Sequence, residues 1–206
     1  KHILKVGFPV AIQDGCVQIA FMIITIIANS RGLNDAAAVG IVEKMITAIF
    51  IIPSTMLATV SALSAQNIGA KNYGRARTVL KYAVMITTLY GIIVALIVEC
   101  AAPTLLGLFT KDTTVILLGV QYISSYIIDT IFAGIHFSFS GYFAADGKSY
   151  IGFIHNIIAI SLVRVPGSYI ASIMYPHNLF PMGLAAPLGS LLSVIICLIA
   201  YRILKK

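Results

Sequence analysis

The chain has 206 residues, of which 59% are hydrophobic and only 10% are charged, and its formal net charge is +7. A soluble domain carries about 25% charged residues, so this composition excludes an ordinary water-soluble globule and favours a protein that lies in a lipid bilayer. The positive charge does not require a nucleic-acid partner, because topology selection and the anionic lipids of an inner leaflet both favour Lys and Arg at one membrane surface.

Six long apolar runs follow one another along the chain. A helix needs roughly 20 apolar residues to cross the hydrocarbon core, and each run is long enough: 7–30, 36–65, 79–107, 114–144, 150–174 and 182–204. The sequence lacks the short alternating segments of a membrane β-barrel. The predicted fold is an all-α membrane protein, a bundle of six transmembrane helices in a single domain over residues 1–206.

Lys and Arg are unevenly distributed between the two ends of these helices. If the first residues lie in the cytoplasm, ten of the 14 Lys and Arg residues fall in cytoplasmic segments, and only Arg31 and Lys111 fall in outer loops. Because cytoplasmic segments are rich in Lys and Arg, we expect both termini in the cytoplasm and the chain in the plasma (inner) membrane, in contact with its lipids.

The first, second and fourth runs each carry a polar stripe with one carboxylate. Steps of four and seven residues keep side chains on one helical face, and the stripes consist of Asp14, Gln18, Thr25 and Asn29; of Glu43, Thr47, Ser54 and Ser61; and of Tyr122, Ser125, Asp129, His136 and Ser140. Ionisable groups inside a membrane are costly, and two interpretations are open. The stripes line a substrate or ion path, or they form interhelical hydrogen bonds that hold the bundle.

Asp129 is the preferred single candidate, because it lies near the middle of the fourth run with His136 two turns further along the same face. A carboxylate in an apolar site can take up a proton near neutral pH. Alternatively, Asp129 forms a structural ion pair with Arg164, the deep cation of the fifth run. His136 is either a proton relay or a hydrogen-bonded contact between helices.

Prolines interrupt two of the predicted helices. Pro53 lies inside the second run, and the pair Pro166 and Gly167 lies inside the fifth. A proline removes one backbone hydrogen bond and allows a kink, and the freed carbonyl must find another partner in lipid. These positions are either static bends or hinges used in transport.

Signals for catalysis are missing from the sequence. Ser138 and Ser140 lie on the same run as His136, without a Gly-x-Ser-x-Gly elbow, and no phosphate-binding loop, zinc-ligand spacing or dinucleotide fingerprint is seen. The three cysteines are interpreted as small buried hydrophobes. We expect a non-enzyme without a metal or an organic cofactor.

Several short motifs resemble one known family in their order and spacing. They are Lys-Val-Gly-Phe-Pro at 5–9, Gln13, Ala-Ala-Ala-Val-Gly-Ile at 36–41, Gln-Asn-Ile-Gly-Ala at 66–70 and Arg-Ala at 75–76. The chain is similar over essentially its whole length to the carboxy-terminal six-helix lobe of a MATE (multidrug and toxic-compound extrusion) transporter.

This resemblance implies a secondary antiporter, or half of one, that exports organic, cationic or aromatic compounds in exchange for H⁺ or Na⁺. The family fold has two six-helix lobes with the substrate between them, so a second lobe, from the same or a different chain, is an expected partner. The resemblance also implies acids on the first and fourth helices as ligands, for which Asp14 and Asp129 are the candidates, while Val17 stands where the sodium-coupled branch has its first acid.

Two alternatives to an antiporter remain. One is a flippase for a lipid-linked precursor, which would need a deeper basic cavity than Arg164 alone offers. The other is a non-transporting membrane scaffold subunit. The candidate substrate- or ion-binding residues are Asp129, Asp14, Gln18, Glu43, His136, Tyr122, Arg164 and Asn29, and the hinge candidates are Pro53, Pro166 and Gly167.

Overall fold

The computed structural model describes the backbone of residues 2–204 and the side chains of residues 11–13 and 15–204. This part of the chain forms long helices joined by short loops and contains no strand. The elements are α1 (His2–Arg31), α2 (Leu33–Ile49), α3 (Ile51–Gly69), α4 (Tyr73–Gly107), α5 (Thr113–Tyr126), α6 (Asp129–Ala145), α7 (Ser149–Ala159), the π-helical turn η1 (Ile160–Arg164), α8 (Val165–Met174) and α9 (Phe180–Leu204).

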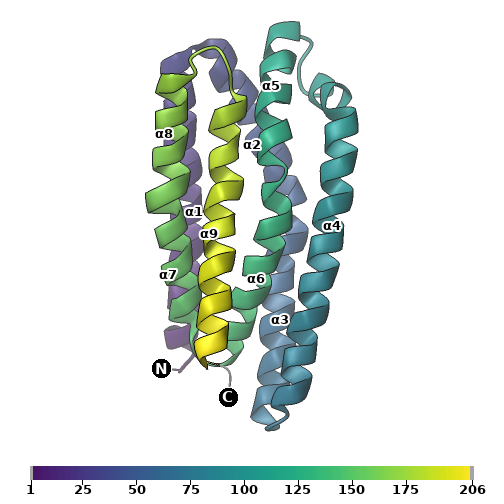
Figure 1. The fold of residues 1–206 in the computed structure, drawn as a ribbon, viewed down its shortest axis with the longest axis vertical. Helices are drawn as coiled ribbons and strands as arrows, with labels where there is room; N and C mark the ends of the chain where they lie inside the picture. The colour runs from purple at the N-terminus through teal and green to yellow at the C-terminus, as the bar shows by residue number, and fades with distance from the viewer. Residues whose placement is uncertain (1, 205–206) are drawn as a thin grey trace.

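These elements assemble into six rods, which confirms the predicted all-α bundle. Five stretches of the described chain are long and apolar enough to cross a membrane, and α5 and α6, which are bent by 43° at the break between them, would make a sixth if they form one span. The rods lie side by side along the long axis, and both ends of the chain are at the same end of the lobe, as an even number of crossings requires (Figure 1). The helix α6 packs against α3 and α4, whereas α9 packs against α5, α6 and α8.

The outer surface of the bundle is apolar. Large hydrophobic side chains are exposed along α4, for example Met85, Leu89, Leu96 and Ile97. Side chains of this kind stay exposed only where the surrounding medium is itself apolar. The surface therefore fits hydrocarbon rather than water.

Glycine allows α4 and α6 to approach each other closely. A Cβ atom at Gly91 would lie 2.8 Å from Cα of Ile131, and one at Gly134 would lie 2.6 Å from Cβ of Thr87. In a membrane the hydrophobic effect does not drive helices together, so helices associate through close packing. Small residues at the helix contacts make that packing possible.

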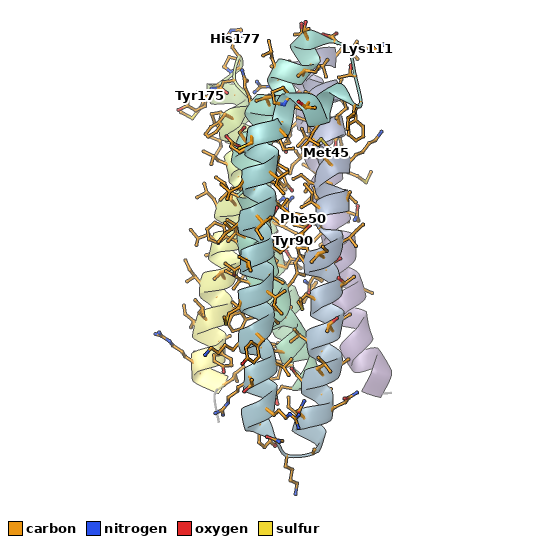
Figure 2. All side chains as sticks on the ribbon, turned by 90° about the vertical axis from the view of Figure 1, so that its right-hand side faces the viewer. Met45, Phe50, Tyr90, Lys111, Tyr175 and His177 are labelled. Carbon is orange, nitrogen blue, oxygen red and sulfur yellow. The ribbon has the colours of Figure 1, made fainter. Side chains whose placement is uncertain are left out.

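The second predicted helix is broken near its middle. It ends as α2 at Ile49 and resumes as α3 at Ile51, so the break lies at Phe50, three residues before Pro53. Pro53 has no N–H to donate to the carbonyl of Ile49. That carbonyl instead accepts a hydrogen bond of 2.9 Å from the hydroxyl of Tyr90 on α4, and Figure 2 shows Phe50 and Tyr90 close together near mid-length.

The fifth predicted helix changes its winding between residues 160 and 164, where η1 separates α7 from α8. Pro166 and Gly167 follow in the first turn of α8. Single π-turns inside helices are frequent at functional sites. Here the turn ends on Arg164, the deep cation of this rod.

The bend between α5 and α6 was not anticipated from the sequence. It lies at Ile127 and Ile128, where neither proline nor glycine marks a kink. The amides of Thr130 and Ile131 bond to carbonyls three residues back rather than four. As a result, a new helix begins at Asp129 in the middle of the rod.

Candidate functional site

A small cavity lies inside the bundle where α1, α6, α7, η1 and α9 meet. Its volume is about 40 Å³, which exceeds the roughly 15 Å³ that a single water molecule requires. The polar residues that line it are Asp129, His136, Asn156, Arg164, Ser190 and Ser193. The cavity can therefore hold water or a small ion next to charged groups.

Asp129 is the first residue of α6 and is completely buried. Neither of its carboxylate oxygens makes a hydrogen bond of full geometry with a described residue, although the hydroxyl of Ser190 interacts with the carboxylate. The bend at 127–128 places this carboxylate at the amino-terminal turn of a helix, where the helix dipole favours negative charge. A buried carboxylate without such a bond is costly, and it is therefore a candidate to bind a proton or a cation.

Arg164 lines the same cavity from η1. Its Nη2 donates to the hydroxyl of Tyr126, and its guanidinium lies over the rings of Phe21 and Tyr126, at 4.8 and 5.5 Å from the ring centroids. Its Nε has no hydrogen-bond partner in the described part of the chain.

The expected alternative of an ion pair between Asp129 and Arg164 is not seen. Between described residues, the ion pairs within 4.0 Å are those of Arg31 with Asp35 and of Lys148 with Asp146. Two opposite charges thus line one cavity without direct contact, and a bound ion or water can lie between them.

Glu43 links two of the predicted stripes. Its Oε2 accepts a hydrogen bond of 2.9 Å from Thr25 on α1, whereas its Oε1 is buried without a partner among the described side chains. This contact fits the interpretation of the stripes as interhelical hydrogen bonds, because it joins α1 to α2.

A second, more open groove lies beside the cavity and has a volume of about 350 Å³. Its polar lining residues are Gln18, Thr47 and Ser54. Four apolar side chains line both the groove and the cavity, namely Val17, Phe21, Phe50 and Phe137. An aromatic wall therefore lies between the groove and the charged interior.

The remaining candidates lie elsewhere. Asn29 is exposed near the carboxyl end of α1, and Tyr122 is buried on α5, with the centroid of its ring 5.6 Å from that of Tyr126. The side chain of Asp14 lies outside the described residues. The structure thus brings Asp129, His136 and Arg164 together at the cavity, and Glu43 and Gln18 occupy neighbouring positions.

Several residues of the site were missed from the sequence. Asn156, Ser190 and Ser193 complete the cavity from α7 and α9, and Tyr126 is the hydrogen-bond partner of Arg164. Ser190 and Ser193 are three residues apart on α9, which places them on one helical face. This spacing of two polar residues in the sixth apolar run is the signal for the pair that the sequence offers.

The MatE family model matches residues 9–170, which is most of the chain. The chain belongs to the MatE family. It is 21% identical over 170 residues to the probable multidrug resistance protein YoeA of Bacillus subtilis, a match that covers 82% of this chain and 37% of that protein.

Solved structures of MATE transporters have the same fold. The Vibrio cholerae MATE transporter VcmN aligns over 97% of this chain and 45% of its own, with a TM-score of 0.89 and 18% identity. An outward-facing multidrug resistance MATE family transporter of the MOP superfamily aligns over 98% and 45%, with a TM-score of 0.90 and 18% identity. The chain is therefore an integral membrane protein of a transporter family, and it spans less than half the length of these relatives.

Proposed function

We propose that this chain is one lobe of a secondary antiporter that exports organic, cationic or aromatic compounds in exchange for H⁺ or Na⁺. The observation that carries the proposal is the carboxylate of Asp129, which is buried without a hydrogen bond of full geometry in a cavity large enough for an ion. Membership of the MatE family and the multidrug resistance named for YoeA support the same class of function.

The groove is the proposed contact surface for the exported compound. Its volume falls within the roughly 300–1,000 Å³ of small-molecule sites, and its lining combines the rings of Phe21, Phe50 and Phe137 with few polar groups. Aromatic faces attract organic cations as well as flat apolar rings. Gln18 and Thr47 would orient the bound compound through hydrogen bonds.

Asp129 is the proposed site of the coupling ion. A proton or Na⁺ on this carboxylate would neutralise a charge that otherwise lies near Arg164 and Ser190 in the cavity. Because Phe21 and Phe50 separate the cavity from the groove, a change of charge at Asp129 would alter the position of these rings. Ion binding and compound binding would then exclude each other, as exchange requires.

The groove is lined by residues of α1, α2, α3 and α6 and is open on its remaining side, so we expect a second lobe to face it. This chain covers 45% of each of the two related transporters described above. A second lobe, from another copy or from another part of a longer protein, would then enclose the compound, and lipids would contact the remaining surface. We further expect that the end with both termini is cytoplasmic, in the plasma (inner) membrane.

The hinge candidates belong to the same proposal. The break at Phe50 and the π-turn before Pro166 and Gly167 both lie beside the cavity. Breaks of this kind can absorb the changes that alternate access requires. Pro53 would allow the first break and Pro166 the second.

The flippase alternative receives less support from the site. The groove has no Lys or Arg among its lining residues, and a cavity of about 40 Å³ with a single arginine is too small for a pyrophosphate group. The scaffold alternative predicts that the charge of Asp129 has no effect beyond folding.

Ethidium movement in proteoliposomes tests the proposal, first with an imposed H⁺ gradient and then with a Na⁺ gradient. We expect movement that depends on one of the two gradients and is lost in Asp129→Asn, whereas Glu99→Gln, an exposed acid on α4, keeps it. Wild-type rates in Asp129→Asn would contradict the role of Asp129. Ethidium movement that depends on neither the H⁺ nor the Na⁺ gradient would contradict antiport.

A further inference from the structure

A column of buried polar side chains continues from the cavity toward the end of the lobe that holds both termini. It consists of His136, His155, Ser140 and Gln13, all of which are buried. The helices that carry these residues, α1, α6 and α7, extend to that end of the bundle (Figure 1). The candidate site described above uses only the first member, His136.

The first three members of the column are in contact. The rings of His136 and His155 meet edge to face with centroids 5.4 Å apart. The Nε2 of His155 is 2.9 Å from Oγ of Ser140. Ser140 lies one turn beyond His136 on α6, so His155 on α7 bridges two successive turns of the neighbouring helix.

Gln13 extends the column to α1. A Cβ atom at Gly152 would lie 3.2 Å from Oγ of Ser140 and 3.3 Å from Oε1 of Gln13. Both polar groups therefore border the bare backbone of Gly152, and a larger residue there would push them apart. Gln13 is 2% exposed, and its Nε2 has no partner among the described residues.

The histidines also have unpartnered nitrogens. The Nδ1 atoms of His136 and His155 are both buried without a hydrogen bond in the described part of the chain. Buried polar atoms are nearly always bonded to protein or to ordered water. His136 lines a cavity that has room for water, so water can supply the missing bond there.

We propose that His136, His155 and Ser140 conduct protons between Asp129 and the end of the lobe that holds both termini, with water in the cavity as the first link and water held by Gln13 as the last. The direction and purpose of this path rest on the proposed antiport. No Lys, Arg, Asp or Glu belongs to the column, so its members can pass protons without holding a fixed charge.

Each step conserves protons. A neutral imidazole accepts a proton at one nitrogen while it releases another from the opposite nitrogen, and it is left as the other tautomer. His155 would accept at Nδ1 and release from Nε2 to Ser140, whose hydroxyl passes its own proton to water held by Gln13. A turn of the ring restores the first tautomer.

Charged groups of both signs lie near His136. Asp129 on its own helix and Arg164 on η1 line the same cavity, and the ring of His155 on α7 contacts the ring of His136. α9 contributes the hydroxyls of Ser190 and Ser193 to the cavity, and α1 contributes the apolar side chains of Val17 and Phe21. The column therefore begins beside two opposite charges, one of which is the proposed ion site.

Nitrogen NMR of the histidine-labelled chain in lipid bilayers tests the path without any transport. We expect both tautomers of His136 and His155 and rapid exchange of their N–H protons with water, and the variants His136→Gln and His155→Gln assign the signals. A single tautomer for each ring, with N–H protons protected for hours, would identify dry structural hydrogen bonds and overturn the proposal.

Ethidium transport under an H⁺ gradient provides the second measurement. His155→Gln keeps a side chain that can bond to Ser140 but cannot relay protons, and we expect about a hundredfold slower coupled transport with unchanged ethidium binding. The matched control is His177→Gln, an exposed histidine in the loop at the opposite end (Figure 2).

The outcomes separate this path from the antiport itself. If the wild-type protein shows neither H⁺-coupled nor Na⁺-coupled transport but its histidines exchange rapidly, the proposed antiport fails and the path stands. If coupled transport persists at wild-type rates in His155→Gln, the antiport stands and the path is overturned.

Discussion

Two arginines mark two kinds of environment in this lobe. Arg31, at the end opposite the termini, donates to Asp35 at 2.6 Å and to three backbone carbonyls, of Ser172, Tyr175 and Pro176, at 2.9–3.2 Å. Arg164, in the interior, donates to one hydroxyl and keeps a buried Nε without a partner among the described residues.

The two arginines differ in how completely their hydrogen bonds are satisfied. Arg31 ties the end of α1 to the start of α2 and to the loop after α8, and its hydrogen-bonding groups are satisfied. Around Arg164 there are further buried polar atoms without a hydrogen-bond partner among the described residues, on Asp129, His136 and Asn156. Unsatisfied buried groups reduce stability, so their presence together at one cavity supports the proposed ion site.

The largest expected effect comes from the interior. Asp129→Asn removes the charge and keeps the shape, so the bundle should fold while ion-coupled ethidium transport falls by about a hundredfold. Flux in proteoliposomes measures this, and circular dichroism checks the fold. An equal loss of transport in Glu99→Gln would show that the effect is not specific to the cavity.

Replacement of Arg31 should affect stability rather than transport. Arg31→Met removes charge-assisted hydrogen bonds to Asp35 and to the loop, which should cost about 2 kcal/mol of the free energy of unfolding. Denaturant unfolding in detergent measures this loss, and hydrogen exchange should increase at residues 172–178. Unchanged stability would mean that the end of the lobe opposite the termini is held by apolar packing alone.

Arg164→Met should show the opposite pattern. The substitution removes the charge that faces Asp129 but keeps a long apolar side chain between Phe21 and Tyr126, so we expect about tenfold slower ion-coupled flux, the factor that corresponds to about 1.4 kcal/mol. The free energy of unfolding should change less than in Arg31→Met. A larger loss of stability than in Arg31→Met would reverse the comparison and make Arg164 structural.

The smallest effect is expected at the break between α2 and α3. Tyr90→Phe leaves the carbonyl of Ile49 without its hydrogen bond, which should cost about 1 kcal/mol. Amide exchange at residues 49–54 should become faster. Tyr82→Phe, at an exposed position of the same helix, is the matched control and should change neither quantity.

The length of each rod and the fold class follow from the sequence by itself. Hydropathy is a local property, since a helix that crosses the bilayer must be apolar over its own length whatever its neighbours are. The predicted runs therefore agree with the observed rods to within a few residues at most ends. The exceptions are the starts of two rods: the structure begins α1 at His2 rather than at residue 7, and α4 at Tyr73 rather than at residue 79.

The sequence also identified the charged members of the cavity, because each ionisable group inside an apolar run stands out. This signal identifies Asp129, His136 and Arg164, which lie together at the cavity. Their partners were less visible, since Asn156, Ser190 and Ser193 are ordinary polar residues whose significance depends on what faces them.

Only the tertiary structure decided which polar groups share a space. The rotation of each rod about its axis determines this, and so does the bend at 127–128, which has no proline or glycine to announce it. Gln18 and Asn29 share a predicted stripe with Thr25, yet Gln18 borders the groove, Thr25 bonds to Glu43 and Asn29 is exposed. Spacing along one helix predicts a common face, but the packing of the other helices determines what that face meets.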